Sequence, residues 1–521
     1  MDISISCYLT IIPIKDLRFN NGKWGINFLE AIKRIKGTPK VEVISWTPPR
    51  TALIDPSTFG EINIPIKKES ANKTFKIIPY FASFYEPVIY KAKAGIDLGG
   101  TFKNNYSINL TYNPDFAQIE GDIDQINLSK TNLWLQEKRP FFMEKGDILS
   151  SLLTLMYTRS IDTIKYGGKI TGNLNGMDIY SFYVFEKSDT SNNIFCLRTK
   201  NNFGDNWVGF YETSKLKDNF FNHSIGIDGK LKLLFQSDLN YAVAATYTKG
   251  LPNKNNFAYV FEIRRSTINK GLMYKFSYKE FQENYNPEVG FVSLPQIRSG
   301  NGSLSYIFPI NYFGIQSISP SLSYSNWRNI NDNSLILESY QPSIVINFKR
   351  IFNLGYSIKK YTRLINNQYF NNLTNNLNVN IVPSGKFNMS VFYIFGKYYN
   401  SNLYYPGVSV STTPRDNLSM AFSLDYFFIN NDDHKEKTLI SSVIINWNIT
   451  KKLTYRTFLQ WSDESNELQY NSLISYDFFV GSHIYLAWNE VRDISNFNFQ
   501  NKNLPLTDRT LYLKICYTFK I

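Results

Sequence analysis

The feature that most constrains the fold is an alternation of apolar and polar residues. It runs from about Thr74 to the C-terminus, in segments of roughly 9 to 13 residues. Side chains of a β-strand point alternately to opposite faces, so each segment would present one apolar and one polar face. Breaks rich in Asn, Asp and Gly separate the segments, as expected for turns. The final segment shows the alternation most clearly, with one face made of Leu511, Leu513, Ile515, Tyr517, Phe519 and Ile521.

Two architectures produce this pattern, a soluble sandwich or propeller and a membrane β-barrel. The segment length favours the barrel, because a tilted membrane strand needs about 9 to 11 residues whereas ordinary strands have about 5 or 6. Aromatic residues make up 16% of the chain, which suits girdles at two membrane interfaces. No repeat of propeller-blade length is visible. The sequence therefore predicts an all-β fold, a large antiparallel transmembrane β-barrel.

The barrel is expected to occupy residues 71–521. At about 20 residues for each strand with its connection, this length gives about 22 strands, within a range of about 18 to 24. A barrel of this size has room inside for a plug. The chain has no apolar run of about 18 residues, so no transmembrane helix is expected.

Residues 113–150 do not alternate like their surroundings and are rich in charge. A long charged segment among membrane strands needs a polar location, and the inside of the barrel offers one. We therefore predict that 113–150 is a plug or constriction in the lumen. Its charge network would consist of Asp115, Glu120, Asp122, Asp124, Glu137, Lys138, Arg139 and Glu144.

Apolar residues within this segment are expected to anchor it. The Arg139–Pro140 dipeptide disfavours a helix at this point. The rings that follow would pack under a hydrophobic lid while the neighbouring charges pair with the barrel wall; ordinary core packing is the alternative. The expected anchors are Phe116, Pro140, Phe141 and Phe142.

Metal and catalytic sites were weighed on the same residues. Glu120, Asp122 and Asp124 would project to one side of an extended stretch, where Lys and Arg or a divalent cation could neutralise them. The segment lacks the spacing of a calcium loop, so we predict no metal and no cofactor. Carboxylate pairs such as Glu137 with Glu144, or Glu120 with Asp122, could serve glycoside hydrolysis.

His483 lies near Asp477 in sequence, which keeps a barrel hydrolase open as an alternative. No nucleophile motif accompanies the histidines, so no catalytic residue is assigned and a non-enzymatic role is favoured. Three cysteines, Cys7, Cys196 and Cys516, fit no metal or redox motif. The net charge of +13 comes from scattered Lys and Arg rather than from a basic stripe, so no nucleic-acid partner is expected.

Several motifs resemble those of a bacterial family known as domain of unknown function 5916. They are NPDFAQIEGDIDQINL at 113–128, EKRPFFMEKGDI at 137–148, YTRSI at 157–161, YGGKITG at 166–172 and YNPEVGFV at 285–292. Residues 16–28 and 45–48 resemble the end of the family's N-terminal domain, which is similar to carbohydrate-binding module family 9.

The resemblance implies that residues 1–70 are the C-terminal remnant of that β-sandwich domain plus a linker marked by Pro56, Gly60 and Pro65. It also implies an export signal ahead of the chain, since the first residues do not read as one. We expect a monomeric barrel in the outer membrane of a Gram-negative bacterium, with membrane lipid as its partner. The expected role is a plugged channel or surface platform of unknown substrate. The alternative is a carbohydrate-binding or carbohydrate-active protein that uses the barrel as an anchor.

Overall fold

The computed structural model describes residues 23–26, 29–33, 41–45, 60–63, 74–86, 89–102, 106–114, 124–128, 131–187, 191–266, 270–348, 352–384, 386–431, 435–479, 481–497 and 504–520. The chain divides into two compact units. One comprises Met1–Lys73 with Phe102–Asn104, and the other Thr74–Thr101 with Asn105–Ile521.

The first unit contains two antiparallel strand pairs among its described residues. Strand β1 (Lys23–Ile26) pairs with β4 (Gly60–Asn63), and β2 (Leu29–Lys33) pairs with β3 (Val41–Ser45). Gly60 was expected to mark a linker, but it begins β4, so that interpretation is wrong at this position. The β-sandwich remnant expected for this region stays a prediction.

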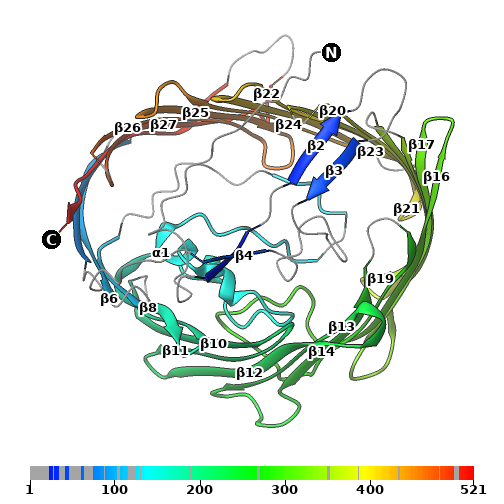
Figure 1. Cartoon of the computed structure of the whole chain (residues 1–521), viewed down its shortest axis with the longest axis horizontal. Helices are drawn as coiled ribbons and strands as arrows, with labels where there is room; N and C mark the ends of the chain where they lie inside the picture. The colour runs from blue at the N-terminus through cyan, green and yellow to red at the C-terminus, as the bar shows by residue number, and fades with distance from the viewer. Residues whose placement is uncertain are drawn as a thin grey trace. The chain divides into compact units, whose positions relative to one another are not determined.

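The second unit is a closed antiparallel barrel of 24 strands, β5 to β28, counted over the described residues. The short β29 continues β28, and both pair with β5 to close the ring. Figure 1 shows the strands forming the ring, with α1 and neighbouring coil inside it. The all-β barrel predicted from the alternation is confirmed, and the count lies at the upper end of the predicted range.

The strands of the first half of the barrel are β5 (Thr74–Glu86), β6 (Ile89–Phe102), β7 (Tyr106–Tyr112), β8 (Ile164–Leu174), β9 (Met177–Lys187), β10 (Ser191–Phe203), β11 (Asn206–Lys217), β12 (Phe220–Lys232), β13 (Ser237–Thr248), β14 (Phe257–Arg265), β15 (Gly271–Phe281) and β16 (Ile297–Tyr312).

The second half consists of β17 (Ile315–Asn329), β18 (Leu335–Phe348), β19 (Phe352–Ile365), β20 (Gln368–Ser384), β21 (Phe387–Tyr398), β22 (Ser401–Arg415), β23 (Leu418–Asn430), β24 (Lys435–Asn448), β25 (Leu453–Ser462), β26 (Glu467–Phe479), β27 (Ser482–Asp493), β28 (Leu506–Cys516) and β29 (Phe519–Lys520). The described helices are single turns: α1 (Pro140–Met143), η3 (Gly146–Leu149), η4 (Thr158–Ser160) and η5 (Leu234–Gln236). None of the described helices is long and apolar enough to span a membrane.

The two ends of the barrel differ in their connections. The longest ones, 113–163, 249–256, 282–296 and 494–505, all follow odd-numbered strands and so lie at one end, here called the loop end. Thr74 and Lys520 lie at the opposite, terminal end, where Asn175–Gly176 forms a two-residue turn. Both of these residues have positive φ (50° and 94°), as the hairpin turn that matches strand twist requires.

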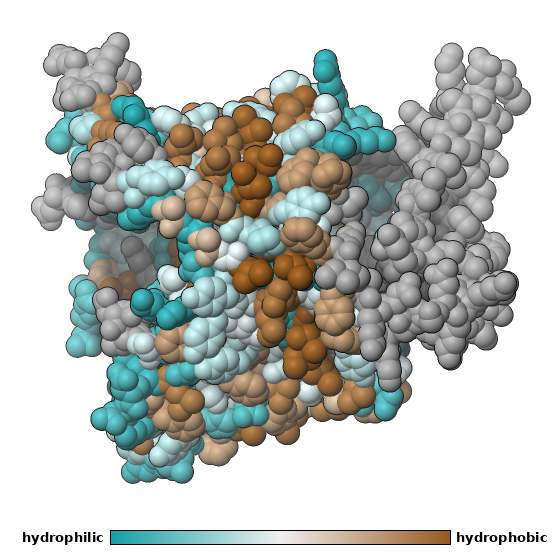
Figure 2. All heavy atoms as spheres, turned by 90° about the vertical axis from the view of Figure 1, so that its left-hand side faces the viewer, coloured by the Kyte–Doolittle hydropathy of each residue, from teal (hydrophilic) through white to brown (hydrophobic). Residues whose placement is uncertain are grey.

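The outer face of the barrel carries large apolar side chains exposed along the strands. Directly paired positions such as Leu304 with Leu322, and Ile474 with Leu486, share this face. Figure 2 shows apolar residues over the side of the barrel that faces the viewer, with hydrophilic residues interspersed and along its left edge. Others on this face are Phe276, Tyr426, Leu459 and Leu513.

The inner face differs between two parts of the barrel. Along β9 to β14, here called the covered wall, the buried side chains include a set of apolar ones: Tyr180, Phe182, Val184, Ile194, Cys196, Tyr211, Ala242, Ala244, Ala258 and Val260. Polar side chains on the same strands are buried as well: Glu186, Asn192, Arg198, Thr213, Asn222, Ser224, Asp228, Ser237, Thr246, Thr248 and Glu262. Away from the loop end of β20 to β23, a part here called the open wall, the following inward positions are polar and not buried: Asn376, Asn378, Asn380, Ser390, Ser409, Ser411 and Ser423. Nearer the loop end, these strands contribute Tyr398, Leu403 and Phe427 to a buried apolar cluster.

Candidate functional site: the lumenal insert

The connection between β7 and β8, residues 113–163, is here called the insert. Its described parts are 113–114, 124–128 and 131–163, and these lie inside the barrel. It leaves the wall beside β6, where the Lys93 ammonium donates to the carbonyl of Pro114 over 3.0 Å. Asp115, Phe116, Glu120 and Asp122, which the sequence predicts as site residues, lie outside the described residues.

The insert next reaches β25 and the turn that follows it. The Asp124 amide donates to Oε1 of Gln460 on β25 over 3.1 Å, and its carboxylate accepts from the Ser465 hydroxyl over 2.8 Å. Ile126 and Leu128 then pack against a second apolar cluster on the inner face, made of Leu337, Tyr361, Tyr398, Leu403 and Phe427. One continuous segment therefore contacts strands from β18 to β25.

The returning part of the insert is joined by the loop 282–296, which carries the YNPEVGFV motif. The Tyr157 amide donates to the carbonyl of Val289 over 2.7 Å, and Thr154 and Phe291 form an antiparallel bridge. Gly290 lies so close to the backbone of the insert that an added Cβ would be 2.4 Å from the carbonyl oxygen of Thr154. The glycine of this motif therefore permits a close backbone contact.

Glu137 and Arg139 form the most polar buried contact of the insert. The Arg139 guanidinium, 5% exposed, donates to both oxygens of Glu137 at 2.9 and 2.7 Å. It also donates to the carbonyls of Thr158 and, over 2.6 Å, Ile161. Burial raises the pKa of Glu137, but hydrogen bonds from Arg139 and Thr158 outweigh burial and hold that pKa below its usual value. These contacts tie two distant parts of the insert together.

The Arg139–Pro140 dipeptide was expected to disfavour a helix. Pro140 begins α1, so that expectation holds for Arg139 only. Proline is well tolerated at the first helical position because its missing N–H would have no helical partner. Phe142 is buried, with its ring 5.4 Å from Phe182 of β9, whereas Phe141 is half-buried beside it. The Phe142 ring therefore contacts the covered wall, and the anchoring role of these residues stays a prediction.

Glu144 contacts the wall. Its carboxylate accepts from the Lys169 ammonium at 3.2 Å and from the Asn109 amide at 2.9 Å. Lys169, with a fully buried side chain, also donates to the carbonyl of Phe141 over 2.6 Å. The sequence analysis expects charges of the insert to pair with the wall; Glu144 does so, whereas Glu137 pairs with Arg139 of the insert itself. For Lys138 the backbone amide donates to Glu137 over 2.9 Å.

Sequence analysis missed a second buried ion pair. Arg198 of β10 donates to both oxygens of Asp228 on β12 at 2.6 and 2.9 Å, and to the carbonyl of Ile148 in the insert over 2.9 Å. The sequence did carry a signal that this part of the wall is covered from inside, because β9 reads MDIYSFYVFEK and is apolar on both faces. A membrane strand with two apolar faces must have its inner face covered.

The described residues offer little for catalysis. No group of three or more His, Cys, Asp or Glu among them could hold a metal ion. Glu137 and Glu144 each face a base, so the structure engages them in ion pairs. His483 and Asp477 are brought together on the inner face, with Nδ1 and Oδ1 2.6 Å apart.

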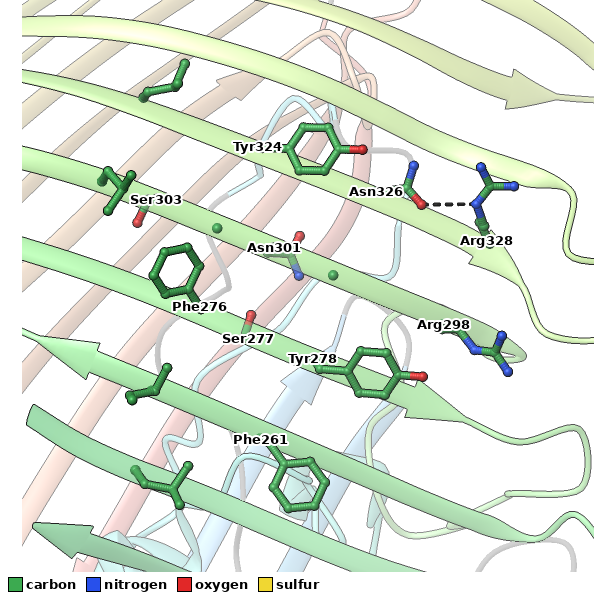
Figure 3. A pocket seen from close by; sticks show the side chains of 16 residues that line it. Phe261, Phe276, Ser277, Tyr278, Arg298, Asn301, Ser303, Tyr324, Asn326 and Arg328 are labelled. Atoms are coloured by element: carbon green, nitrogen blue, oxygen red, sulfur yellow. Dashed lines mark hydrogen bonds between the residues drawn. The ribbon is translucent and has the colours of Figure 1, made fainter. Parts of the chain in front are cut away.

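A groove of about 700 Å³ lies on the outer face over β13 to β17. Gly300 and Gly302 leave its floor bare, and an added Cβ at Gly300 would meet no atom within 4 Å. Figure 3 shows the rings of Phe276, Tyr278 and Tyr324 around it, with Arg298 and Arg328 at the end nearer the loops. Other outward arginines, Arg492 and Arg509, also lie near the loop end. The apolar outer face is therefore bordered by charge at this end.

Residues 75–175, which include the insert and its motifs, match the family model described as domain of unknown function DUF5916. The resemblance inferred from the NPDF and EKRPFF motifs is thereby confirmed for this part of the chain. No curated protein matches the chain in sequence.

Solved structures similar to this chain include the siderophore receptor PirA of Pseudomonas aeruginosa, with 9% identity, a TM-score of 0.44, and coverage of 87% of this chain and 81% of that one. The iron transporter FrpB of Neisseria meningitidis is similar at 8% identity and a TM-score of 0.44, over 86% of this chain and 81% of that one. At these values the likeness supports no argument about what this chain binds.

Proposed function

We propose that this protein is an outer-membrane β-barrel whose bore is closed by the insert, so that it acts as a plugged channel. The outer face supports membrane insertion. Each square ångström of apolar surface held in water costs about 25 cal/mol, and lipid removes that cost. The closed ring pairs the backbone of the described strands, as a lipid environment requires.

The orientation of the barrel in the membrane follows from the lengths of the connections between its strands. Outer-membrane barrels have short turns on the periplasmic side and longer loops outside. The loop end would therefore face the exterior, and the terminal end, with Thr74 and Lys520, the periplasm. The absence of an unpaired edge among the described barrel strands favours a monomer with lipid as its neighbour.

The observation that carries the proposal is the path of the insert. It contacts β25 at Asp124, the cluster on β18 to β23 at Leu128, and the covered wall from Phe142 to Leu155. Barrels of about 22 strands have a lumen wide enough to need a plug. An insert that touches opposite sides of the ring obstructs the bore.

Planar-bilayer recording tests the proposal. Deleting residues 120–148 should raise the single-channel conductance several-fold, because it removes the cross-bore segment. A matched deletion of 250–254, in an exposed loop, should leave conductance unchanged. Should the large deletion fail to fold, Arg139→Ala offers a milder release of the insert. Equal conductance of full-length and released proteins would contradict the channel and favour a surface platform.

A further inference from the structure

The groove on the outer face runs along a part of β16 that lacks large side chains. Gly302 lies directly between Phe276 of β15 and Tyr324 of β17, and Gly300 lies beside Tyr278. Glycine inside a strand weakens it and often marks a place where a ligand approaches the backbone closely. The two glycines thus form a bare floor between aromatic side chains on both neighbouring strands.

The groove has the length of one membrane leaflet. Arg298 at one end and Leu304 at the other are six residues apart on β16. At about 3.3 Å per residue this separation is about 20 Å along the strand, or about 15 Å along the membrane normal for a tilt of about 40°. Half of a hydrocarbon core of about 30 Å is also about 15 Å. An acyl chain lying on the glycine floor would therefore reach the middle of the membrane.

Two arginines lie at the loop end of the groove. Arg298 and Arg328 are directly opposite each other on β16 and β17, a position in which like charges repel. Among the described residues that line the groove, these two are the charged ones. Figure 3 shows both guanidinium groups at the same end, beyond the rings.

Only one of the two arginines contacts an acid among the described residues. Glu280 accepts from Nε of Arg298 at 3.0 Å. Arg328 instead donates to neutral groups, Oδ1 of Asn326 at 3.2 Å and the carbonyl of Asn333 at 3.0 Å.

The next acid along this face, Glu338, lies opposite Asn326 and accepts from the hydroxyls of Tyr324 and Tyr340. No ion pair joins Glu338 to Arg328 in the described part of the chain. The pair of arginines is therefore one contacting anion short.

We propose that this groove binds a phosphorylated lipid of the outer leaflet, with its phosphate between Arg298 and Arg328 and one acyl chain along Gly300 and Gly302. The planar fork of arginine matches a phosphate, and a shared anion removes the repulsion between the two guanidinium groups. A lipid without phosphate would leave Arg328 without its anion, and a free phosphate would leave the apolar floor bare.

This inference goes beyond the plugged channel. It rests on the membrane placement and orientation proposed above, which put the loop end at the exterior. It depends neither on the insert nor on conduction, because every residue that lines the groove belongs to the strands of the wall.

Native mass spectrometry of the full chain in detergent tests the site, with dimyristoylphosphatidic acid as the probe. This lipid should stay bound at a concentration at least about tenfold lower than dimyristoylglycerol, which has the same chains but no phosphate. Glycerol 3-phosphate, which has the phosphate but no chains, should not displace it. Equal retention of the two lipids, or displacement by glycerol 3-phosphate, would overturn the proposal.

Variants locate the binding. Arg328→Gln should weaken retention of the phosphatidic acid by about tenfold or more. Gly300→Leu fills the floor while leaving both arginines in place, and it should abolish retention. Since an added Cβ at Gly300 would meet no atom within 4 Å, this variant should fold.

Two control variants lie on the outer face but outside the groove. Arg492→Gln removes an outward arginine near the loop end, one that pairs with Glu490, and Ala245→Leu adds bulk opposite the exposed Phe257. Both should retain the lipid. Equal loss in Arg328→Gln and Arg492→Gln would reduce the effect to general electrostatics, and full retention by Gly300→Leu would place the chain elsewhere; either result contradicts the site.

The lipid site and the channel fail separately. A protein that retains phosphatidic acid at Arg328 but shows no conductance change when 120–148 is deleted keeps the site and loses the channel. A protein that opens on this deletion but does not distinguish phosphatidic acid from dimyristoylglycerol keeps the channel and loses the site.

Discussion

The covered wall and the open wall belong to one sheet, yet their inner faces differ in burial. Inward side chains of β9 to β14 are buried, apolar and polar alike, whereas the Asn and Ser side chains of the open wall are not buried. Their outer faces are alike, since both expose large apolar side chains. The difference therefore comes from what lies inside the barrel, and the insert accounts for it.

The largest effect is expected where a buried charge holds the insert together. Arg139→Ala leaves the partly buried Glu137 without its cation. It also removes the guanidinium donor from the carbonyls of Ile161 and Asp162, whereas the carbonyl of Thr158 keeps the Ile161 amide. Breaking a buried pair in this way costs about 3 to 5 kcal/mol. Trypsin should then cleave the insert faster, and conductance should rise. Lys386→Ala, in an exposed ion pair with Asp416, should change neither; a similar response of both variants would contradict a special role for Arg139.

A smaller effect should follow from crowding the covered wall. An added Cβ at Gly226 would lie 2.8 Å from Leu155 of the insert, so Gly226→Leu should displace the insert at a cost of about 1 to 3 kcal/mol. Ser409→Leu makes a similar change on the open wall, where the inward side chain is exposed, and should cost little. Thermal unfolding and limited proteolysis compare the two. Equal destabilisation would show that the walls do not differ as described.

Acid should release the insert, because the stability of the docked insert depends on the ionised carboxylate of Glu137. Its pKa in the folded protein is below the usual value, so the ionised carboxylate stabilises the docked insert at neutral pH. This contribution is lost as pH falls through the folded pKa. Conductance should therefore rise only at a pH below the ordinary pKa of a glutamate carboxyl. In Glu137→Gln this acid step should be absent, and an unchanged pH profile in that variant would assign the step to other groups.

The smallest expected difference concerns single hydroxyls. Thr213 of the covered wall is fully buried and donates to the carbonyl of Leu155 over 3.3 Å, so Thr213→Val should cost about 1 kcal/mol. Ser409→Ala on the open wall should cost less than about 0.5 kcal/mol because water replaces the lost hydroxyl. Urea titration of both variants measures the difference between their free energies of unfolding. A larger loss for Ser409→Ala would reverse the comparison.

The sequence predicted the wall of the barrel because a strand between lipid and water needs alternation at every position. The outward set Leu511, Leu513 and Ile515 lies where the period of two places it, and these side chains are exposed. The strand number was harder to predict, because an average length per strand cannot resolve two-residue turns such as Asn175–Gly176.

The path of the insert could not be read from sequence, because its contacts are long-range. Asp124 binds Gln460, 336 residues away, and no local pattern encodes that pairing. Arg198 and Asp228 each occupy an inward position, but only the register of β10 to β12 brings them together. Local composition did single out Arg139, Phe142 and Glu144, since charges and rings in a non-alternating segment need partners; their role in a plug stays a prediction.

Thiol labelling tests the central claim most directly. With Cys7 and Cys516 replaced by serine, Cys196 reports on the covered wall, where its side chain is fully buried, and Ser409→Cys reports on the open wall. A charged methanethiosulfonate reagent should modify Ser409→Cys rapidly and leave Cys196 unmodified until the insert is deleted. Modification of Cys196 in the intact protein at a rate like that of Ser409→Cys would contradict an insert packed against β9 to β14.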